Sequence, residues 1–186
     1  AVSAVAPLVV GAAGTQHAGL EREVTVLGTT SQMLAIRHWQ LASGRFLPDL
    51  DWSLAQPVCV LGERVRRELF ADTPALGRWI RLGDRRYRVI GVLASEGRSI
   101  GIDVEEIVII PVASAMALFD TDSMFRILVE AGTRDAVPTV IRYVRGTITA
   151  RHRGEEDVTV VTQDAVLQTF DQILGALTMT VGGIAG

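Results

Sequence analysis

The stretch PVCVLGERVRRELF, residues 57–70, decides the fold class of this 186-residue chain. Its first part, 57–62, is a continuous apolar run of the kind that forms a buried strand. Its second part, 63–70, places Val65 and Leu69 on one helical face and most of its charges on the other. A buried strand that passes directly into an amphipathic helix predicts a mixed α/β domain.

Hydrophobic periodicity predicts further elements on both sides of this unit. The run 79–94 has a polar turn at Asp84–Arg86 between two apolar stretches, which is typical of a hairpin. We expect a loop at 43–52, because it holds Gly44 and Pro48. Other strands are expected at 24–28, 107–111, 124–131 and 158–162, and other helices at 31–38 (capped by Thr30), 112–119, 135–152 and from Gln163 onward (capped by Thr162).

Composition excludes several classes of protein. A hydrophobic fraction of 48% and a charged fraction of 21% exclude a disordered chain. The formal net charge of −3 gives no global basic field, which argues against a nucleic-acid partner. All 18 basic residues are arginine, so Schiff-base and P-loop chemistry that depends on lysine is excluded. One cysteine excludes an internal disulfide.

The histidines and the cysteine do not form a catalytic pattern. His17, His38 and His152 lack the paired spacing of a metal-binding helix. Cys59 lies inside the apolar run 58–61, where we expect a small hydrophobic side chain with a raised pKa and poor reactivity. We therefore predict no catalytic and no metal-binding residue among these four.

Acidic and glycine-rich segments are equally weak as sites. Asp120–Ser123 resembles the start of a calcium loop but lacks the glycine and the glutamate that such a loop needs, so we expect a solvated turn. Glu155–Asp157 reads as a charged turn, and the glycines at 97 and 101 lack the spacing of a phosphate loop. No cofactor is predicted. Three tryptophans are expected in the core or at a seam between subdomains: Trp39, Trp52 and Trp79.

The last residues, 173–186, carry no charge and hold four glycines among apolar residues. Glycine of this kind is more frequent in membrane helices than in soluble ones. We expect 171–186 to be the start of a transmembrane helix that is cut short, since the run is below the roughly 20 residues of a full span. A flexible apolar tail is the alternative.

The order of the elements suggests two subdomains. Residues 1–48 and 120–170 each look incomplete, whereas 49–119 has its own strands, hairpin and helix. We predict an α+β fold in which a β-rich subdomain, 49–119, is inserted into a discontinuous α/β subdomain. On this prediction 24–28 packs with the C-terminal third and 50–118 forms a separate layer. A single simple domain is the alternative.

A succession of short motifs then resembles one family. GRFL (44–47), VCVLG (58–62), ELF (68–70), PALG (74–77), YRVIGVL (87–93) and IVIIPV (107–112) occur in the order found in the extracytoplasmic, periplasmic core domain of MacB-like and FtsX-like ABC transporter permeases. ITARHRGEEDVTVVTQ (148–163) resembles the segment before the second membrane helix of that family. The resemblance implies a porter-like discontinuous subdomain and a sabre-like inserted one. It also implies a membrane helix before Ala1, another beginning near Ile173, and two more after it.

The resemblance also implies a function without chemistry in this segment. In such permeases a separate nucleotide-binding domain hydrolyses ATP in the cytoplasm, and the extracytoplasmic domains move cargo by mechanotransmission, in export or lipoprotein release. Implied partners are the ABC ATPase subunit, a second permease copy, the membrane, and a periplasmic adaptor or a lipoprotein or peptide cargo. The implied location is the inner or plasma membrane, with this domain on the extracytoplasmic side.

One departure and two alternatives stand beside this resemblance. The loop Ser95–Asp103 is shorter than the insertion common in the family, which puts contact with an outer-membrane exit duct in doubt. The main alternative is a stand-alone extracytoplasmic module that binds a ligand or peptide. A small hydrolase is the other, and it requires a nucleophile that the spacing does not reveal.

Overall fold

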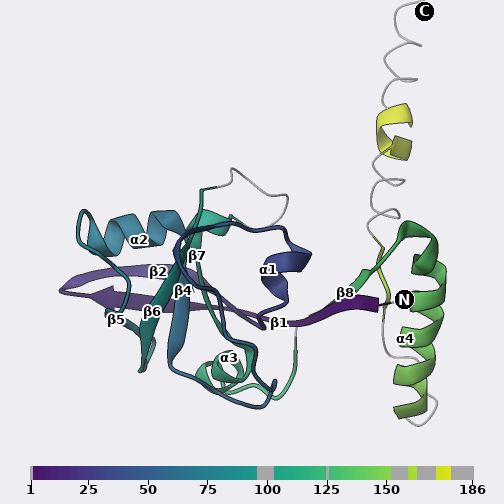
Figure 1. Cartoon of the computed structure of the whole chain (residues 1–186), viewed down its shortest axis with the longest axis horizontal. Coiled ribbons are helices and arrows are strands. Elements are labelled where there is room, and N and C mark those ends of the chain that lie inside the picture. Colours follow the sequence, from purple (N-terminus) through teal and green to yellow (C-terminus); the bar gives the residue numbers. More distant parts are fainter. Residues whose placement is uncertain (1, 96–102, 125, 152–158, 163–170, 177–186) are drawn as a thin grey trace, which may run out of the picture. The chain divides into compact units, whose positions relative to one another are not determined.

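A computed structural model describes residues 2–95, 103–124, 126–151, 159–162 and 171–176 (Figure 1). The chain divides into two compact units, a larger one of residues 2–132 and a smaller one that contains residues 133–186. Each unit is described by itself.

The larger unit is built mainly of strands. They are β1 (Val2–His17), β2 (Leu20–Thr29), β3 (Leu41–Gly44), β4 (Val58–Leu61), β5 (Trp79–Leu82), β6 (Arg85–Leu93), β7 (Ile107–Pro111) and β8 (Arg126–Ala131). Its helices are α1 (Met33–Ile36), α2 (Glu63–Phe70) and α3 (Val112–Leu118), and the 3-10 turn η1 (Val104–Glu106) precedes β7.

Six of these strands pair in a closed ring. The order of hydrogen-bonded neighbours is β2–β7–β4–β6–β5–β1, and β1 pairs again with β2. The β2–β7 and β4–β6 pairs are parallel and the remaining pairs of the ring are antiparallel. β3 pairs with β6, and β8 pairs with β1. Closure of this kind removes the exposed strand edges that an open sheet would present.

The two faces of the ring strands bury different hydrophobic clusters. In β2, Val24 and Val26 belong to one cluster, while Leu27 belongs to the other. β4 divides in the same way, because Cys59 and Leu61 join the first cluster and Val60 joins the second. The period of two along a strand explains this division. Burying side chains on both faces also explains why 57–62 is apolar without interruption.

Gly62 allows the strand β4 to pass directly into the helix α2. A Cβ at this position would lie 2.4 Å from the carbonyl oxygens of Val104 and Glu105. The Gly62 N–H donates a hydrogen bond to the Ile107 carbonyl oxygen at 2.8 Å. The start of α2 is therefore held against η1, at a separation that leaves no room for a side chain.

The prediction for the central elements is confirmed. β4, α2, β5, β6, β7 and α3 all lie within a residue or two of their expected positions. The hairpin turn falls at Gly83–Asp84, slightly earlier than the expected 84–86. Local periodicity is a good guide here because each element is short and bounded by a glycine, a proline or a polar turn.

Three local predictions are wrong. The helix expected over 31–38 is the single turn α1, and Thr30 does not cap it, because its hydroxyl is buried without a hydrogen-bond partner. β3 lies partly inside the expected loop 43–52. Residues 159–162 form no strand, and residue 158 lies outside the described residues. In the first case His38, at φ 55°, ends the helix after one turn.

The expectation that 50–118 forms a separate layer is also wrong. β7 comes from that segment and pairs with β2 along residues 25–29, while β5 pairs with β1. The physical reason is ring closure, since β1 and β2 cover edges that β5 and β7 would otherwise expose. The subdomain boundaries at 48 and 120 stay a prediction. The pairings favour a division within β1 instead, where the partner changes between Leu8 and Val9.

The smaller unit contains the 3-10 turn η2 (Arg134–Ala136) and the helix α4 (Val137–Arg151), which confirms the helix expected at 135–152 over its described part. Residues 171–176 are also helical. Among the described residues, no helix has the length and hydropathy that a membrane crossing requires. The end of the predicted membrane helix, 177–186, lies outside those residues. So does most of the helix expected from Gln163, since 163–170 are not described.

Candidate functional site

The strand β1 is the longest element of the larger unit and the one that joins its parts. It has 16 residues, which at about 3.3 Å per residue corresponds to a strand roughly 50 Å long. Residues 2–8 pair with β8, and residues 9–17 pair with β2 (Figure 1). β1 therefore runs without a break from Val2, where the chain enters this unit, to His17, at the turn before β2.

The chain leaves the larger unit beside the place where it enters. β8 is antiparallel to β1 and pairs residues 126–131 with residues 2–8. The Ser3 hydroxyl donates to the Glu130 carbonyl oxygen at 3.1 Å, and it also lies 2.9 Å from the Glu130 carboxylate atom Oε2. The Pro7 carbonyl accepts a buried hydrogen bond from the Thr29 hydroxyl at 2.8 Å. We call residues 2–8 with β8 the entry ribbon.

A cluster of ion pairs joins β2, α2 and η1. Arg22 of β2 contacts Glu68 of α2 and Glu106 of η1, and Arg64 of α2 contacts Glu106 as well. Arg64 also lies 3.5 Å from Glu105. These five residues come from three elements that are distant in the sequence. They therefore add electrostatic cross-links to a region that hydrogen bonds of the sheet alone would not connect.

The charge on Glu106 depends on this cluster. Partial burial alone would raise the pKa of Glu106, but hydrogen bonds from Arg22 and Arg64 and their positive charge lower it below its usual value. The same carboxylate raises the pKa of the Arg64 guanidinium. A lowered pKa in the folded state means that Glu106 stabilises the fold above its unfolded pKa, and that this contribution is lost as the pH falls through the folded pKa.

We expect Glu106→Gln to lower the free energy of unfolding at pH 7 by about 1 kcal/mol or less, because the cluster is partly exposed and screened by solvent. The two proteins should become more alike in free energy of unfolding as the pH falls below the ordinary glutamate pKa of about 4.3 and then through the lower pKa of Glu106 in the folded state. Urea unfolding of both proteins between pH 3 and pH 7 measures this. A difference that stays constant over that range would contradict the ion-pair role.

The histidines lie apart from one another. The His17 Nδ1–H donates to the Trp79 carbonyl oxygen at 3.0 Å, and its ring lies 4.1 Å from that of Phe70. His38 is exposed at the end of α1. His152 lies outside the described residues. In the part of the chain that the structure describes, no three His, Cys, Asp or Glu side chains gather in a way that could hold a metal ion.

Cys59 is fully buried in β4, as the apolar run around it predicts. Burial disfavours the thiolate and raises the pKa of the Cys59 thiol far above its usual value. We expect Cys59 to resist a thiol reagent such as DTNB in the native chain and to react at once in denaturant. Equal labelling rates in the two states would contradict the buried position.

The remaining weak candidates are accounted for as follows. Asp120 has a φ of 49°, and after it the Ser123 N–H donates to the Thr121 hydroxyl at 3.2 Å, which is a polar turn as predicted. The charged turn 155–157 and the glycines at 97 and 101 lie outside the described residues.

Trp39 is in the core, as predicted. Trp52, which is 39% exposed, and Trp79, which is 43% exposed, are not core residues, and their expected place at a seam between subdomains stays a prediction.

One shallow depression lies between β1 and the segment that follows α3. It has a volume of about 330 Å³ and is open to solvent. The aromatic ring of Phe119 lies against Gly11, and a Cβ at Gly11 would come within 2.3 Å of that aromatic ring. Its lining holds no charged side chain, and its polar groups are two hydroxyls; the lining residues are Val9, Val10, Gly11, Phe119, Thr121 and Ser123.

The sequence is similar to ATP-binding/permease proteins. Residues 1–147 match the family described as MacB-like periplasmic core domain. The chain is 26% identical over 173 residues to the macrolide export ATP-binding/permease protein MacB of Wolinella succinogenes, covering 92% of this chain and 27% of that protein. It is 27% identical over 186 residues to the pyoverdine export ATP-binding/permease protein PvdT of Pseudomonas aeruginosa, covering 99% and 28%. The chain therefore spans little more than a quarter of the length of these relatives.

Solved structures share the fold. The periplasmic region of MacB from Actinobacillus actinomycetemcomitans has a TM-score of 0.77 at 20% identity, covering 91% of this chain and 76% of that one. The extracellular domain of the noncanonic ABC-type transporter YknZ from Gram-positive bacteria has a TM-score of 0.72 at 19% identity, covering 87% and 82%. These likenesses confirm the predicted fold class.

Proposed function

The chain belongs to the MacB-like periplasmic core domain family, and from that premise we propose that it couples ATP hydrolysis in the cytoplasm to the movement of cargo outside the membrane. The match over residues 1–147 is the observation that carries this proposal. Two relatives are named as export ATP-binding/permease proteins, and this chain corresponds to little more than a quarter of each. The ATPase would then reside on another domain or subunit.

The residues of the chain support a role without catalysis. A phosphate loop uses a lysine, and this sequence has none. Its one thiol is buried, and its two described histidines, His17 and His38, are far apart in the sequence and belong to different elements. We propose that the domain is not an enzyme and that its contribution is mechanical.

The entry ribbon supplies a physical basis for that contribution. Coupling between distant sites needs elements that move as units. β1 is hydrogen-bonded along its whole length, first to β8 and then to β2, so a displacement at Val2 is carried through the strand to the turn at His17. The Ser3 hydroxyl ties the outer end of the ribbon to β8, and the Thr29 hydroxyl ties Pro7, near its inner end, to β2. We propose that β1 transmits movement into the ring.

The proposed setting follows from the family. Membrane helices before residue 1 and after about residue 171 would anchor the domain on the extracytoplasmic face of the inner or plasma membrane. A second copy of the permease and the ABC ATPase would be its constant partners. An adaptor, or a lipoprotein or peptide cargo, would be a further partner that depends on the system.

Two measurements test the proposal. The 186-residue chain, titrated with Mg·ATP in a calorimeter, should give no binding heat and no phosphate release. The full-length protein, purified with its ATPase and placed in liposomes, should hydrolyse ATP and move cargo, and deletion of residues 2–132 should abolish transport. ATP turnover by the isolated chain, or transport that survives the deletion, would overturn the proposal.

A further inference from the structure

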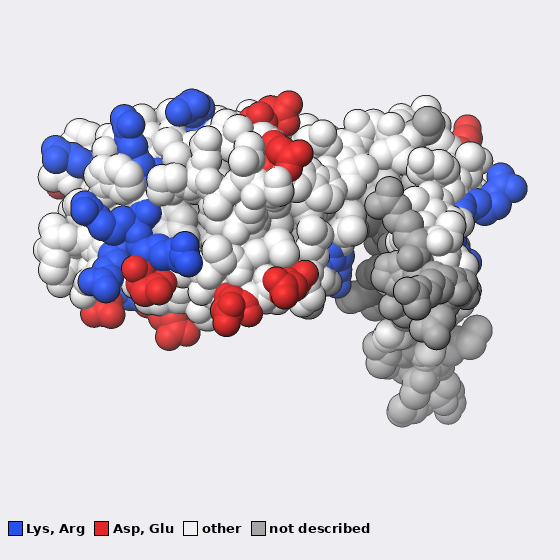
Figure 2. Space-filling view, turned by 90° about the horizontal axis from the view of Figure 1, so that it is seen from below, with Lys and Arg blue, Asp and Glu red and all other residues white. Residues whose placement is uncertain are grey.

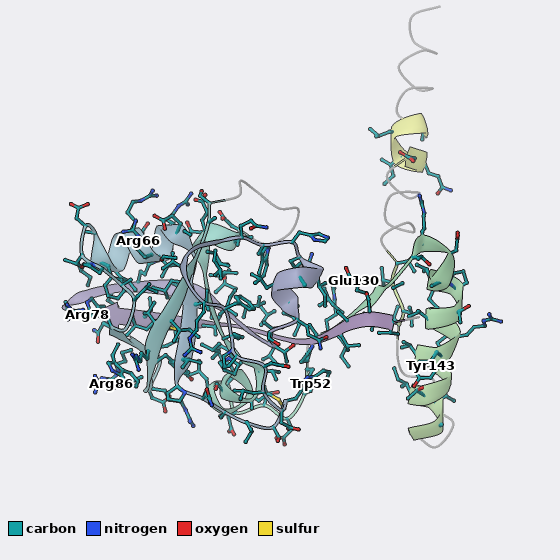
Figure 3. The ribbon with its side chains drawn as sticks, viewed as in Figure 1. Trp52, Arg66, Arg78, Arg86, Glu130 and Tyr143 are labelled. Atoms are coloured by element: carbon teal, nitrogen blue, oxygen red, sulfur yellow. The ribbon has the colours of Figure 1, made fainter. Side chains whose placement is uncertain are left out.

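The hairpin of β5 and β6 carries an unusual concentration of positive charge. Between residues 78 and 88 there are five arginines and a single acid, Asp84, so this segment has a net charge of 5 − 1 = +4 in a chain whose total is −3. Figure 2 shows basic side chains gathered at this end of the larger unit, and Arg78 and Arg86 are labelled there in Figure 3. We call Trp79, Arg81, Arg86 and Arg88 the arginine face.

The strand register places three of these arginines and the tryptophan on one exposed side. Ile80 and Tyr87 are opposite each other and buried, so the pairs on either side of them point outward. Those outward pairs are Trp79 with Arg88 and Arg81 with Arg86. The Arg86 guanidinium also lies over the Trp79 ring, 5.5 Å from its centroid. The tryptophan is thereby framed by two arginines.

The arrangement is unfavourable for the fold taken alone. Arg81 and Arg86 are directly opposite on adjacent strands, where like charges destabilise a sheet. The Arg81 Nε–H donates only to the Gly83 carbonyl oxygen, at 3.2 Å. Within the described part of the chain, no carboxylate lies at ion-pair distance from Arg78, Arg81, Arg86 or Arg88. Features that oppose local stability without compensation are expected at functional sites.

We propose that the arginine face docks an acidic segment of a partner protein, one that carries an apolar side chain to cover Trp79. Arginine and tryptophan are the residue types enriched at the centres of protein–protein interfaces. Planar guanidinium groups bind carboxylates with two parallel hydrogen bonds, so a row of glutamate or aspartate side chains matches the face. Leu76, which is 41% exposed and three residues before Trp79, adds apolar area of the kind such a partner would bury.

A membrane surface is the other anionic partner that basic residues can bind, and the geometry disfavours it. The carbonyl of Trp79 accepts a hydrogen bond from His17, which is the last residue of β1. The face therefore stands at the end of β1 opposite to Val2, at the far end of a strand roughly 50 Å long. This step rests on the proposed function, in which the membrane lies beyond the entry ribbon. The experiments below use the 186-residue chain alone, so their outcome does not depend on transport.

The first experiment measures binding. A short peptide of alternating glutamate and leucine, labelled with a fluorophore, is titrated with the chain at low salt. In a parallel titration, vesicles that contain phosphatidylglycerol replace the peptide. The double variant Arg81→Glu/Arg86→Glu should weaken peptide binding about tenfold or more. The control Arg67→Glu/Arg142→Glu makes the same change in net charge at two other exposed arginines and should alter it less than about twofold. The proposal would be overturned if the first double variant bound the peptide as tightly as the wild type does, or if the wild type bound the vesicles more tightly than the peptide.

The second experiment separates docking from a structural role. Arg81→Glu places an acid opposite Arg86 and replaces a repulsive cross-strand pair with an attractive one. We expect the melting temperature to rise by about 2 °C, while affinity for the acidic peptide falls about fivefold. A gain in stability together with a loss of binding is what a docking face predicts. A lower melting temperature with unchanged peptide affinity would assign Arg81 to the fold and refute the docking face.

Discussion

Replacing Gly91 with alanine is expected to lower the free energy of unfolding by about 3 kcal/mol, which is roughly 6 to 12 °C in the melting temperature. A Cβ at Gly91 would lie 2.1 Å from the carbonyl oxygen of Arg45, a backbone atom that cannot rotate away. The Arg45 N–H also donates to the Ile90 carbonyl at 2.9 Å, so the two segments are fixed at this separation. Relief of the clash would require β3 to leave β6.

A matched substitution controls for the change of residue type. Gly146→Ala lies in the helix α4, and a Cβ there meets nothing within 4 Å. Alanine should stabilise this helix by about 1 kcal/mol, since glycine is the poorer helix former. Urea denaturation followed by circular dichroism measures both variants. If Gly91→Ala unfolds at the same urea concentration as the wild type, the close approach of β3 to β6 is not a constraint on the fold.

Sequence patterns predict this fold best where the structure depends on neighbours in the chain. The strand β4, the helix α2 and the β5–β6 hairpin are each determined by periodicity over fewer than ten residues. The four-residue α1 shows the limit of such reasoning. A helical pattern was present at 31–38, but without a side-chain cap the backbone forms only one turn before His38 ends it.

Ring closure could not be predicted from these patterns, because it depends on pairing between distant segments. β1 reads as an apolar stretch with three glycines or prolines at positions 7, 11 and 14, which weakens any local strand signal. Its order comes from β8, β2 and β5, which begin between 3 and more than 100 residues after its end in the sequence. The expectation that 50–118 packs as a layer apart from β1 and β2 was wrong for the same reason.

The candidate functional features were even less visible in the sequence. The resemblance to a permease family depends on the order of short structural motifs, and it points to no individual functional residue. The ion-pair cluster around Arg22 and Glu106 joins residues more than 80 positions apart. The arginines of 78–88 were visible as charges, but only the register shows that Arg81 faces Arg86 on an exposed side.

The proposed transmission predicts a large and specific effect of a flexible insertion. In the full-length permease, a short glycine-rich segment inserted beside Asp171 should leave ATP hydrolysis largely intact and lower transport by about tenfold or more. Residues 171–176 are helical, and glycine is a poor helix former, so the insertion would interrupt the connection through which this domain would meet its membrane helix. Movement cannot pass through a segment that does not move as a unit. Cargo export and phosphate release, measured in the same liposomes, report the two quantities.

The same insertion placed between Leu54 and Ala55 is the matched control. Both residues are exposed, in the loop that connects β3 to β4, and a loop of this kind tolerates added length at little cost in free energy. Transport should therefore stay close to that of the wild type. Loss of transport in both variants would mean that added glycine merely unfolds the domain. Full transport in the Asp171 variant would show that force does not travel through this connection, and a domain that acts by binding cargo alone would then be the better account.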